Sequence, residues 1–192
     1  IIGMGYINRI AVTADDHVFA GLGNRILRST DNGTTWDSTT VVKGHQSISA
    51  IAFNSTGHVY AGTTYGGADS VSGVYLSTDN GESWKHMGLG GLGLSAMMVN
   101  QKGHVVASAF DCPALCHSKG IYRSTDGGVS WVRTSAGLTD EVVSTLVGNS
   151  LGTLFAGSSS YPQAGGVFCS TDNGDTWSSI NTGLTTTRIM AL

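Results

Sequence analysis

The side chains in this sequence that could do chemistry lie in Gly- and Ser-rich segments and combine carboxylates, aromatic rings and cations. Groups of this mixed kind can hydrogen-bond to, and stack on, a glycan or a peptide. We expect six of them to bind a ligand: Tyr65, Asp69, Asp111, His117, Lys119 and Tyr161. Further polar side chains lie in connecting segments nearby: His45, His86, Asp140 and Glu141.

A glycosidase would need two of these carboxylates to face each other about 5–10 Å apart. Asp111 with Asp140 or Glu141 could form such a pair, but nothing in their spacing distinguishes them from other acids. The sequence therefore favours binding over catalysis, and we assign no catalytic residue.

We expect no metal and no cofactor. Asp172-Asn173-Gly174-Asp175 begins like a calcium loop, yet no ligand series continues to a Glu at the twelfth position. Residues 88–93 fit the pattern G-x-G-x-x-G, but a dinucleotide site also needs a strand before it and a helix after it. The segment Cys112-Pro113-Ala114-Leu115-Cys116-His117 lacks both the C-x-x-C spacing and the fourth ligand of a zinc site.

The three cysteines bear on the cellular compartment. Cys112 and Cys116 are close enough in the chain to form a disulfide across a small loop, and we expect that bond. Cys169 lies in a predicted strand and is expected to stay unpaired. A disulfide is compatible with an oxidising compartment, and we expect an extracellular, cell-surface or periplasmic protein.

The composition restricts the class of protein further. Of the 192 residues, 40% are hydrophobic and 12% are charged, which argues against disorder. The 28 glycines and 2 prolines suit many short strands joined by tight turns. With a net charge of −3 and no basic stripe, we expect no nucleic-acid partner. We expect no membrane insertion either, because no apolar stretch reaches the roughly 20 residues that span a bilayer.

An internal repeat defines the elements that must position these side chains. The pattern S-T-D-x-G-x-[ST]-W occurs four times, with its aspartates at positions 31, 79, 126 and 172, which are 48, 47 and 46 residues apart. This period is typical of four-stranded propeller blades. Three short runs of β-branched and aromatic residues precede each copy, and we predict that they are strands and that the Trp begins a fourth.

The sequence thus predicts an all-β fold of four four-stranded antiparallel β-propeller blades and the first strand of a fifth. We expect one partial propeller over residues 1–192, with blades at 5–40, 46–88, 93–135 and 141–182 and the fifth beginning at 186–192. An open array exposes sheet faces at both ends, so we expect further blades of a parent chain, or self-association, to complete a larger ring. The candidate binding residues fall in loops between second and third strands and in the connections between blades, where recognition usually lies.

The repeated pattern resembles the Asp-box, or BNR, repeat of β-propellers such as sialidases, xyloglucan-degrading hydrolases and sortilin-type receptors. In that family the turn lies at the blade periphery, away from the ligand face, so the resemblance implies a structural role. A Gly at positive φ, an Asp that accepts turn N–H groups and a Trp that covers the hairpin would explain the spacing. We assign that role to Asp31, Gly33, Trp36, Asp79, Gly81, Trp84, Asp126, Gly128, Trp131, Asp172, Gly174 and Trp177.

The resemblance also defines what a hydrolase would need. Sialidase-like members use three arginines, a Tyr–Glu pair and an acidic proton donor; here we align only Arg9 and Arg188, each followed by Ile, at one repeat position.

Our leading hypothesis is a non-catalytic binding or scaffolding module of a secreted or cell-surface protein that recognises a glycan or a protein. The alternative is a fragment of a sialidase-like or xyloglucanase-like glycoside hydrolase whose catalytic residues lie in blades outside this sequence.

Overall fold

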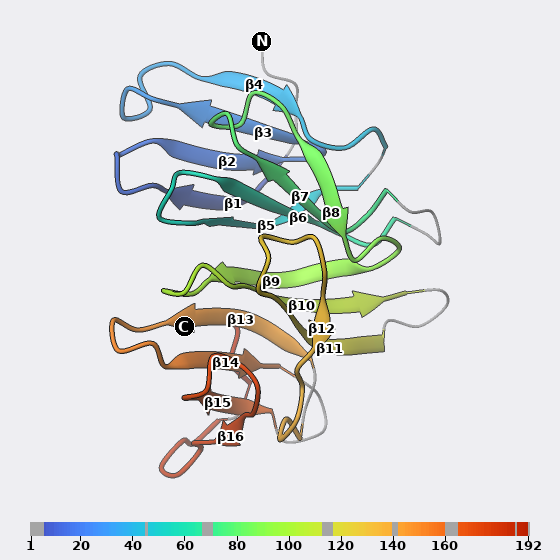
Figure 1. Ribbon diagram of the computed structural model, residues 1–192, viewed down its shortest axis with the longest axis vertical. Helices are drawn as coiled ribbons and strands as arrows, with labels where there is room; N and C mark the ends of the chain where they lie inside the picture. The colour runs from blue at the N-terminus through green and yellow to red at the C-terminus, as the bar shows by residue number, and fades with distance from the viewer. Residues whose placement is uncertain are drawn as a thin grey trace. The chain divides into compact units, whose positions relative to one another are not determined.

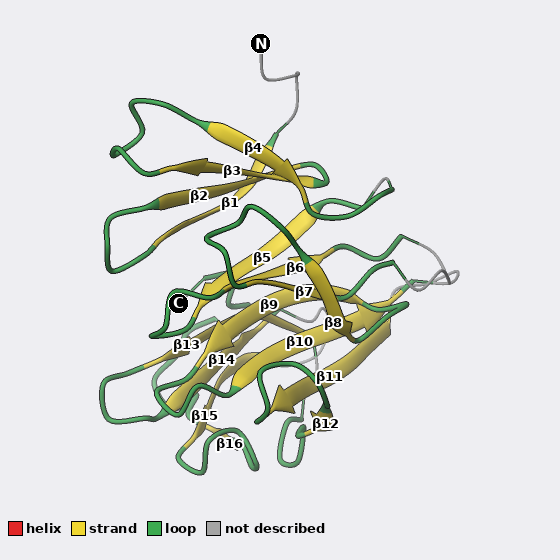
Figure 2. Cartoon of the chain, turned by 45° about the horizontal axis from the view of Figure 1, so that its top comes forward, coloured by secondary structure: helices red, strands yellow, loops and turns green. Residues whose placement is uncertain are grey.

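The computed structural model describes residues 6–44, 46–66, 71–112, 117–139, 142–159, 165–186 and 188–191. Within these ranges the chain forms four separate four-stranded antiparallel sheets (Figures 1 and 2). Over the same residues, no helix is long and apolar enough to cross a membrane. The predicted all-β fold of four four-stranded blades is confirmed.

In every sheet the strands lie in chain order, so that each strand pairs with the next one through a hairpin. Blade 1 consists of β1 (Ile7–Val12), β2 (Val18–Leu22), β3 (Arg25–Ser29) and β4 (Asp37–Thr40). Blade 2 consists of β5 (Ile48–Phe53), β6 (Val59–Thr63), β7 (Val74–Ser77) and β8 (Lys85–Gly88). Blade 3 consists of β9 (Gly93–Val99), β10 (Val105–Asp111), β11 (His117–Ser124) and β12 (Val132–Arg133). Blade 4 consists of β13 (Val143–Gly148), β14 (Leu154–Ser158), β15 (Gly166–Ser170) and β16 (Ser178–Ser179).

The chain divides into two compact units, Ile1–Gly93 and Leu94–Leu192, each of which contains two blades. In unit 1 the inner strand of blade 2, β5, packs against β1 and β2 of blade 1. Ile48 at its start is fully buried, and a Cβ added to Gly21 would lie 2.9 Å from the Ile48 Cβ. Glycine at position 21 is therefore what lets the isoleucine approach β2. The rings of Phe19 and Phe53 add a tilted contact at 5.3 Å.

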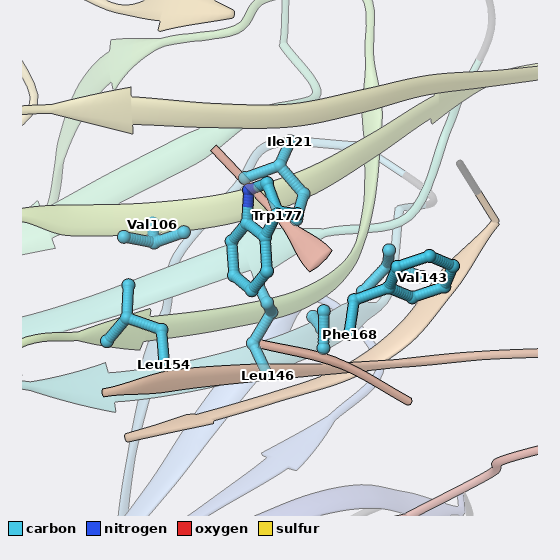
Figure 3. Close-up of a cluster of buried hydrophobic side chains, with 9 residues drawn as sticks. Val106, Ile121, Val143, Leu146, Leu154, Phe168 and Trp177 are labelled. Atoms are coloured by element: carbon cyan, nitrogen blue, oxygen red, sulfur yellow. The ribbon is translucent and has the colours of Figure 1, made fainter. Parts of the chain in front are cut away.

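Unit 2 has a core in which side chains from blades 3 and 4 meet around one indole (Figure 3). Trp177 is 2% exposed, and its Nε1–H donates to the Thr134 carbonyl oxygen at 3.0 Å. Val106 and Ile121 of blade 3 and Leu146 of blade 4 belong to the same buried cluster. The Trp that closes the hairpin of blade 4 thus also joins it to blade 3.

In blades 2, 3 and 4 an asparagine side chain closes the turn between the first two strands, a repeat that we did not predict from the sequence. The Asn100 Oδ1 accepts hydrogen bonds from the backbone N–H groups of Lys102 and His104, both at 3.0 Å. Asn54 and Asn149 make the equivalent pair of bonds in blades 2 and 4. The signal was present as the repeated spacing N-x-x-G, because a side-chain amide can close such a turn on its own backbone.

After blade 4 the chain returns to the inner edge of its sheet. The backbone N–H of Ile189 donates to the Ser158 carbonyl oxygen at 2.8 Å, and a Cβ on Gly157 would lie 2.6 Å from the Ile189 Cγ2. The Ser144 hydroxyl donates to the Ile189 carbonyl oxygen at 2.5 Å, as the Ser95 hydroxyl donates to that of Val143 at 2.6 Å. Ile189 therefore occupies the place that Ile48 takes on blade 1 and Val143 takes on blade 3.

Candidate functional site

The four Asp-box turns share one geometry. In blade 1 the Asp31 carboxylate accepts the Ser29 hydroxyl at 2.8 Å, the Thr35 N–H at 2.8 Å and the Thr35 hydroxyl at 2.6 Å. The Ser29 Oγ also accepts the N–H of Gly33, whose φ is 86°. The same bonds recur around Asp79, Asp126 and Asp172. The aspartate is saturated by its own turn, which leaves it little capacity to act on a ligand.

These hydrogen bonds shift the acidity of the carboxyls. Donation from the side chain and backbone of Thr35 lowers the pKa of Asp31 to about 2. The bonds from Ser83 and Ser130 hold the pKa of Asp79 and Asp126, respectively, well below its ordinary value. For Asp172, burial acts to raise the pKa, but the bonds from Thr176 outweigh it and the pKa is about 2. All four groups are anionic structural acceptors at neutral pH, and none is a proton donor of the kind that a glycosidase needs.

Two arginines connect these turns to the preceding blade. Arg28 of β3 donates to the Asn80 carbonyl oxygen in the box of blade 2 at 2.7 Å. Arg123 of β11 donates to the Asn173 carbonyl oxygen in the box of blade 4 at 3.0 Å. Both asparagines have positive φ, 58° and 64°. In each unit the Asp-box is thus a point of contact between blades.

A different cluster forms at the loop end of blade 3, where β10 and β11 meet. The register shifts between Ala109 and Phe110, so that Lys119 is the extra residue of β11 in a β-bulge. The Lys119 Nζ lies 2.9 Å from Asp111 Oδ2, and the His117 Nδ1 lies 3.9 Å from Asp111 Oδ1. Bulges re-aim side chains at the ends of strands, and this one places a cation, an acid and an imidazole together.

Beside this cluster lies a pocket of about 160 Å³ within unit 2. Its lining is mostly apolar, with hydroxyls and the His117 imidazole as the polar groups. The lining residues are Ser95, Ala109, Phe110, His117, Ser118, Val142 and Val143. Phe110 could not be recognised from the sequence, although it directly precedes Asp111 in the chain, because the direction of its side chain depends on the bulge.

The structure therefore brings together three of the six predicted ligand contacts: Asp111, His117 and Lys119. Tyr65 is half-buried and lies in unit 1. His86 lies on β8 of blade 2 and is exposed; its ring meets Tyr75 edge-on at 5.1 Å and its Nε2 lies 3.2 Å from the Ser72 carbonyl oxygen. The other predicted contacts lie outside the described residues: His45, Asp69, Asp140, Glu141 and Tyr161.

The cysteines are only partly described. Cys112 is disulfide-bonded, and Cys169 is a free thiol. Cys116 lies outside the described residues, so its pairing with Cys112 stays a prediction. In the part of the chain that the structure covers, no group of three or more His, Cys, Asp or Glu side chains could hold a metal ion.

Comparison with known proteins agrees with the repeat and the fold. The family model described as the BNR/Asp-box repeat matches residues 75–86 and 168–179, which contain the boxes of blades 2 and 4. The search of curated proteins found no match to this sequence. The chain carries Asp-box repeats on β-propeller blades.

Solved propellers of several kinds are similar in structure. A Hadza microbial sialidase superposes with a TM-score of 0.65 at 17% identity, over 96% of this chain and 50% of its own. The GH74 xyloglucanase from Xanthomonas campestris gives 0.66 at 19% identity, over 89% of this chain and 29% of its own. An extracellular domain from B. thetaiotaomicron gives 0.66 at 13% identity, over 96% of this chain and 24% of its own. This chain spans half or less of each of these structures, and at such identities the likeness is one of fold.

Proposed function

We propose that this chain is a non-catalytic binding module of a secreted or cell-surface protein, which recognises a glycan or a protein at the loop end of blade 3. The observation that carries this proposal is the Asp111–Lys119–His117 cluster beside the Phe110 pocket. A charged pair next to an apolar pocket offers both the hydrogen-bonding groups and the dispersive surface that ligand sites combine.

The rival proposal, a glycoside hydrolase fragment, has less support from the arginines. The alignment of Arg9 with Arg188 at one repeat position is wrong by three residues. Ile189 occupies the place of Ile48, so that Arg188 corresponds to Ser47 and Arg9 corresponds to Ala50. Arg9 is exposed and its Nε donates to the Ser49 carbonyl oxygen at 2.6 Å. The two arginines therefore supply no matched pair for a substrate carboxylate.

The location outside the cytoplasm rests on two kinds of support. Cys112 is disulfide-bonded, and disulfides persist in oxidising compartments. One of the similar structures is an extracellular domain from B. thetaiotaomicron.

Binding can be tested with the purified chain on arrays of glycans and of peptides. We expect a ligand whose retention falls at least about tenfold in Asp111→Asn and in Phe110→Ala, because both changes alter the loop end of blade 3. Asp15→Asn, an exposed acid in the β1–β2 turn of blade 1, is the matched control and should bind normally. Release of product from any arylglycoside, abolished by Asp111→Asn, would instead identify a hydrolase.

A further inference from the structure

The face of blade 1 that is turned away from blade 2 is apolar and exposed. We infer that it docks on blade 4 of a second copy of this chain, so that copies associate head to tail. The inference concerns a surface other than the loop end of blade 3 and goes beyond the proposed binding function.

The same face is covered in the blades that have a preceding neighbour. At one position of the innermost strand, three residues each pair with an alanine of the second strand: Ile10, Ile51 and Leu146. The preceding blade covers Ile51 in part and leaves Leu146 only 7% exposed, whereas Ile10 is 65% exposed. Val12 is also exposed, although its counterpart Phe53 packs in the unit 1 core. Contiguous exposed apolar surface of this kind marks an interaction site.

Two polar groups of the blade 1 Asp-box stand where the other boxes bond to a preceding blade. The Trp36 Nε1–H donates within its own turn, whereas the indoles of Trp84 and Trp177 donate to the blade before them. The backbone carbonyl of the exposed Asn32 has the box position of two carbonyls that accept from an arginine of the preceding blade. Blade 1 therefore presents an indole donor and a carbonyl acceptor beside its apolar surface.

Blade 4 carries the complementary face. Blade 1 receives blade 2 with Phe19 and Gly21 of its second strand, and blade 4 has Phe155 and Gly157 at the same positions. Phe155 is half-buried, and Ile180, which directly follows β16, is 43% exposed. Blade 4 thus has the aromatic ring and the glycine that receive a following blade.

The first strand of the second copy must compete for one place on blade 4. Ile7 has the repeat position of Ile48, which is fully buried over Gly21, but Ile7 is 52% exposed. On blade 4 the corresponding place over Gly157 is taken by Ile189 of the same chain. Docking exchanges Ile189 for Ile7 of the second copy. Because a group in the same chain has the higher effective concentration, the unmodified chain associates weakly.

The test measures the weight-average mass of the intact chain by sedimentation equilibrium from about 10 μM to about 1 mM. We expect the mass to rise with concentration. Ile189→Ser should tighten the association at least about tenfold, because the place over Gly157 is no longer contested. Cys169→Arg should tighten it about threefold or more, because the arginines at this repeat position in blades 1 and 3 donate to the Asp-box of the following blade.

Paired variants distinguish head-to-tail docking from pairing of like faces. Ile10→Glu disables the blade 1 face and Ile180→Glu disables the blade 4 face, so each variant alone should stay monomeric. An equimolar mixture should form heterodimers, because each variant supplies the face that the other has lost. Both side chains are exposed, and far-UV circular dichroism checks that the variants fold. Val129→Glu, at an exposed apolar residue in the Asp-box of blade 3, is the control and should associate as the unmodified chain does.

Monomers at every concentration, in the unmodified chain and in Ile189→Ser alike, would overturn the inference and leave blade 1 to a partner other than a second copy. Association that survives Ile10→Glu, or that Val129→Glu reduces equally, would also overturn it. Neither result bears on ligand binding at the loop end of blade 3, which is measured separately.

Discussion

The two compact units use the same contacts between blades, but they differ in how tightly they make them. In unit 2 Arg123 forms an ion pair with Asp175 of the next Asp-box at 2.6 Å. In unit 1 the corresponding Arg28 approaches Glu82 at 3.7 Å and also lies 3.6 Å from Asp37 of its own blade. Glu82 has a longer side chain than Asp175, and Arg28 is shared between two acids. The distance between the charged groups is therefore longer in unit 1 than in unit 2.

The box tryptophans show the same difference. Trp177 is 2% exposed and gives its N–H to the preceding blade, at Thr134. Trp84 is only partly buried and shares its N–H between Thr39 of the preceding blade and its own turn, while Trp36 is 37% exposed and bonds within its own turn. The motif thus closes each hairpin by itself, and the contacts of its indole vary with the neighbouring blade.

Replacing the tryptophans should give the largest effects and should rank with burial. We expect Trp177→Ala to lower the free energy of unfolding by about 3–5 kcal/mol, as for other buried aromatic residues. Trp84→Ala should cost less and Trp36→Ala least, because their rings lose less buried contact. Urea unfolding followed by far-UV circular dichroism measures the three values. Equal losses at Trp36 and Trp177 would show that hairpin closure, and not the neighbouring blade, decides the energy.

Gly137 and Gly183 occupy the same repeat position. Replacing each of them distinguishes the cost of backbone strain in the turn from the cost of disturbing the contact between blades. Gly137 and Gly183 have φ of 87° and 86°, but a Cβ on Gly137 would lie 2.0 Å from the Trp177 carbonyl oxygen, whereas Gly183 has no atom within 4 Å of that position. Gly183→Ala should cost about 1–2 kcal/mol from backbone strain alone. Gly137→Ala should cost clearly more, as read from urea midpoints. Matching losses would mean that the backbone at Trp177 can shift freely.

Replacing the arginines should lower the free energy of unfolding by a smaller amount, and the loss should again differ between the two units. Arg123→Met should cost about 1–2 kcal/mol, because charge-assisted hydrogen bonds are lost at a side chain that is 16% exposed. In double-mutant cycles, the coupling of Arg123 with Asp175→Asn should exceed that of Arg28 with Glu82→Gln. Coupling of equal size would argue that the backbone bonds to Asn80 and Asn173 carry the interaction in both units.

The smallest expected effect is a pH dependence specific to unit 2. Burial, followed by the charges of Arg123 and Lys102, lowers the pKa of His104, and its Nδ1 is buried with no hydrogen-bond partner among the described residues. The unfolded chain then binds more protons than the folded one, so that stability falls as pH drops below about 6.5 and levels off below the folded pKa. His104→Thr, the residue type found at position 153, should remove this slope between pH 7 and 5.

The blades could be predicted from the sequence because their determinants are local. The glycine, the aspartate and its serine lie within five positions of one another, so the pattern that the eye finds is also the set of bonds that forms. The same holds for the short runs of β-branched and aromatic residues that form the strands, because each run is contiguous in the chain.

What the sequence could not supply depends on contacts between blades. The burial of Trp177 needs Thr134, and the contact of Arg123 needs Asn173, residues 43 and 50 positions away. The misalignment of Arg188 has a related cause: two Arg-Ile pairs were matched by their letters, while the structural position is set by the isoleucine that fits over a glycine. At the candidate site, the sequence could single out Asp111, His117 and Lys119 as polar residues of one loop, but it could not single out Phe110, because a bulge determines its direction.

The docking of Ile48 over Gly21, and of Ile189 over Gly157, bears on how such an array could be shortened or recombined. A blade that ends at its fourth strand leaves the space over the glycine of its second strand unfilled. The isoleucine of the following repeat fills that space. The smallest transferable module is therefore offset from the sequence period, and a designer who joins or removes blades should cut after that isoleucine and not at the Asp-box.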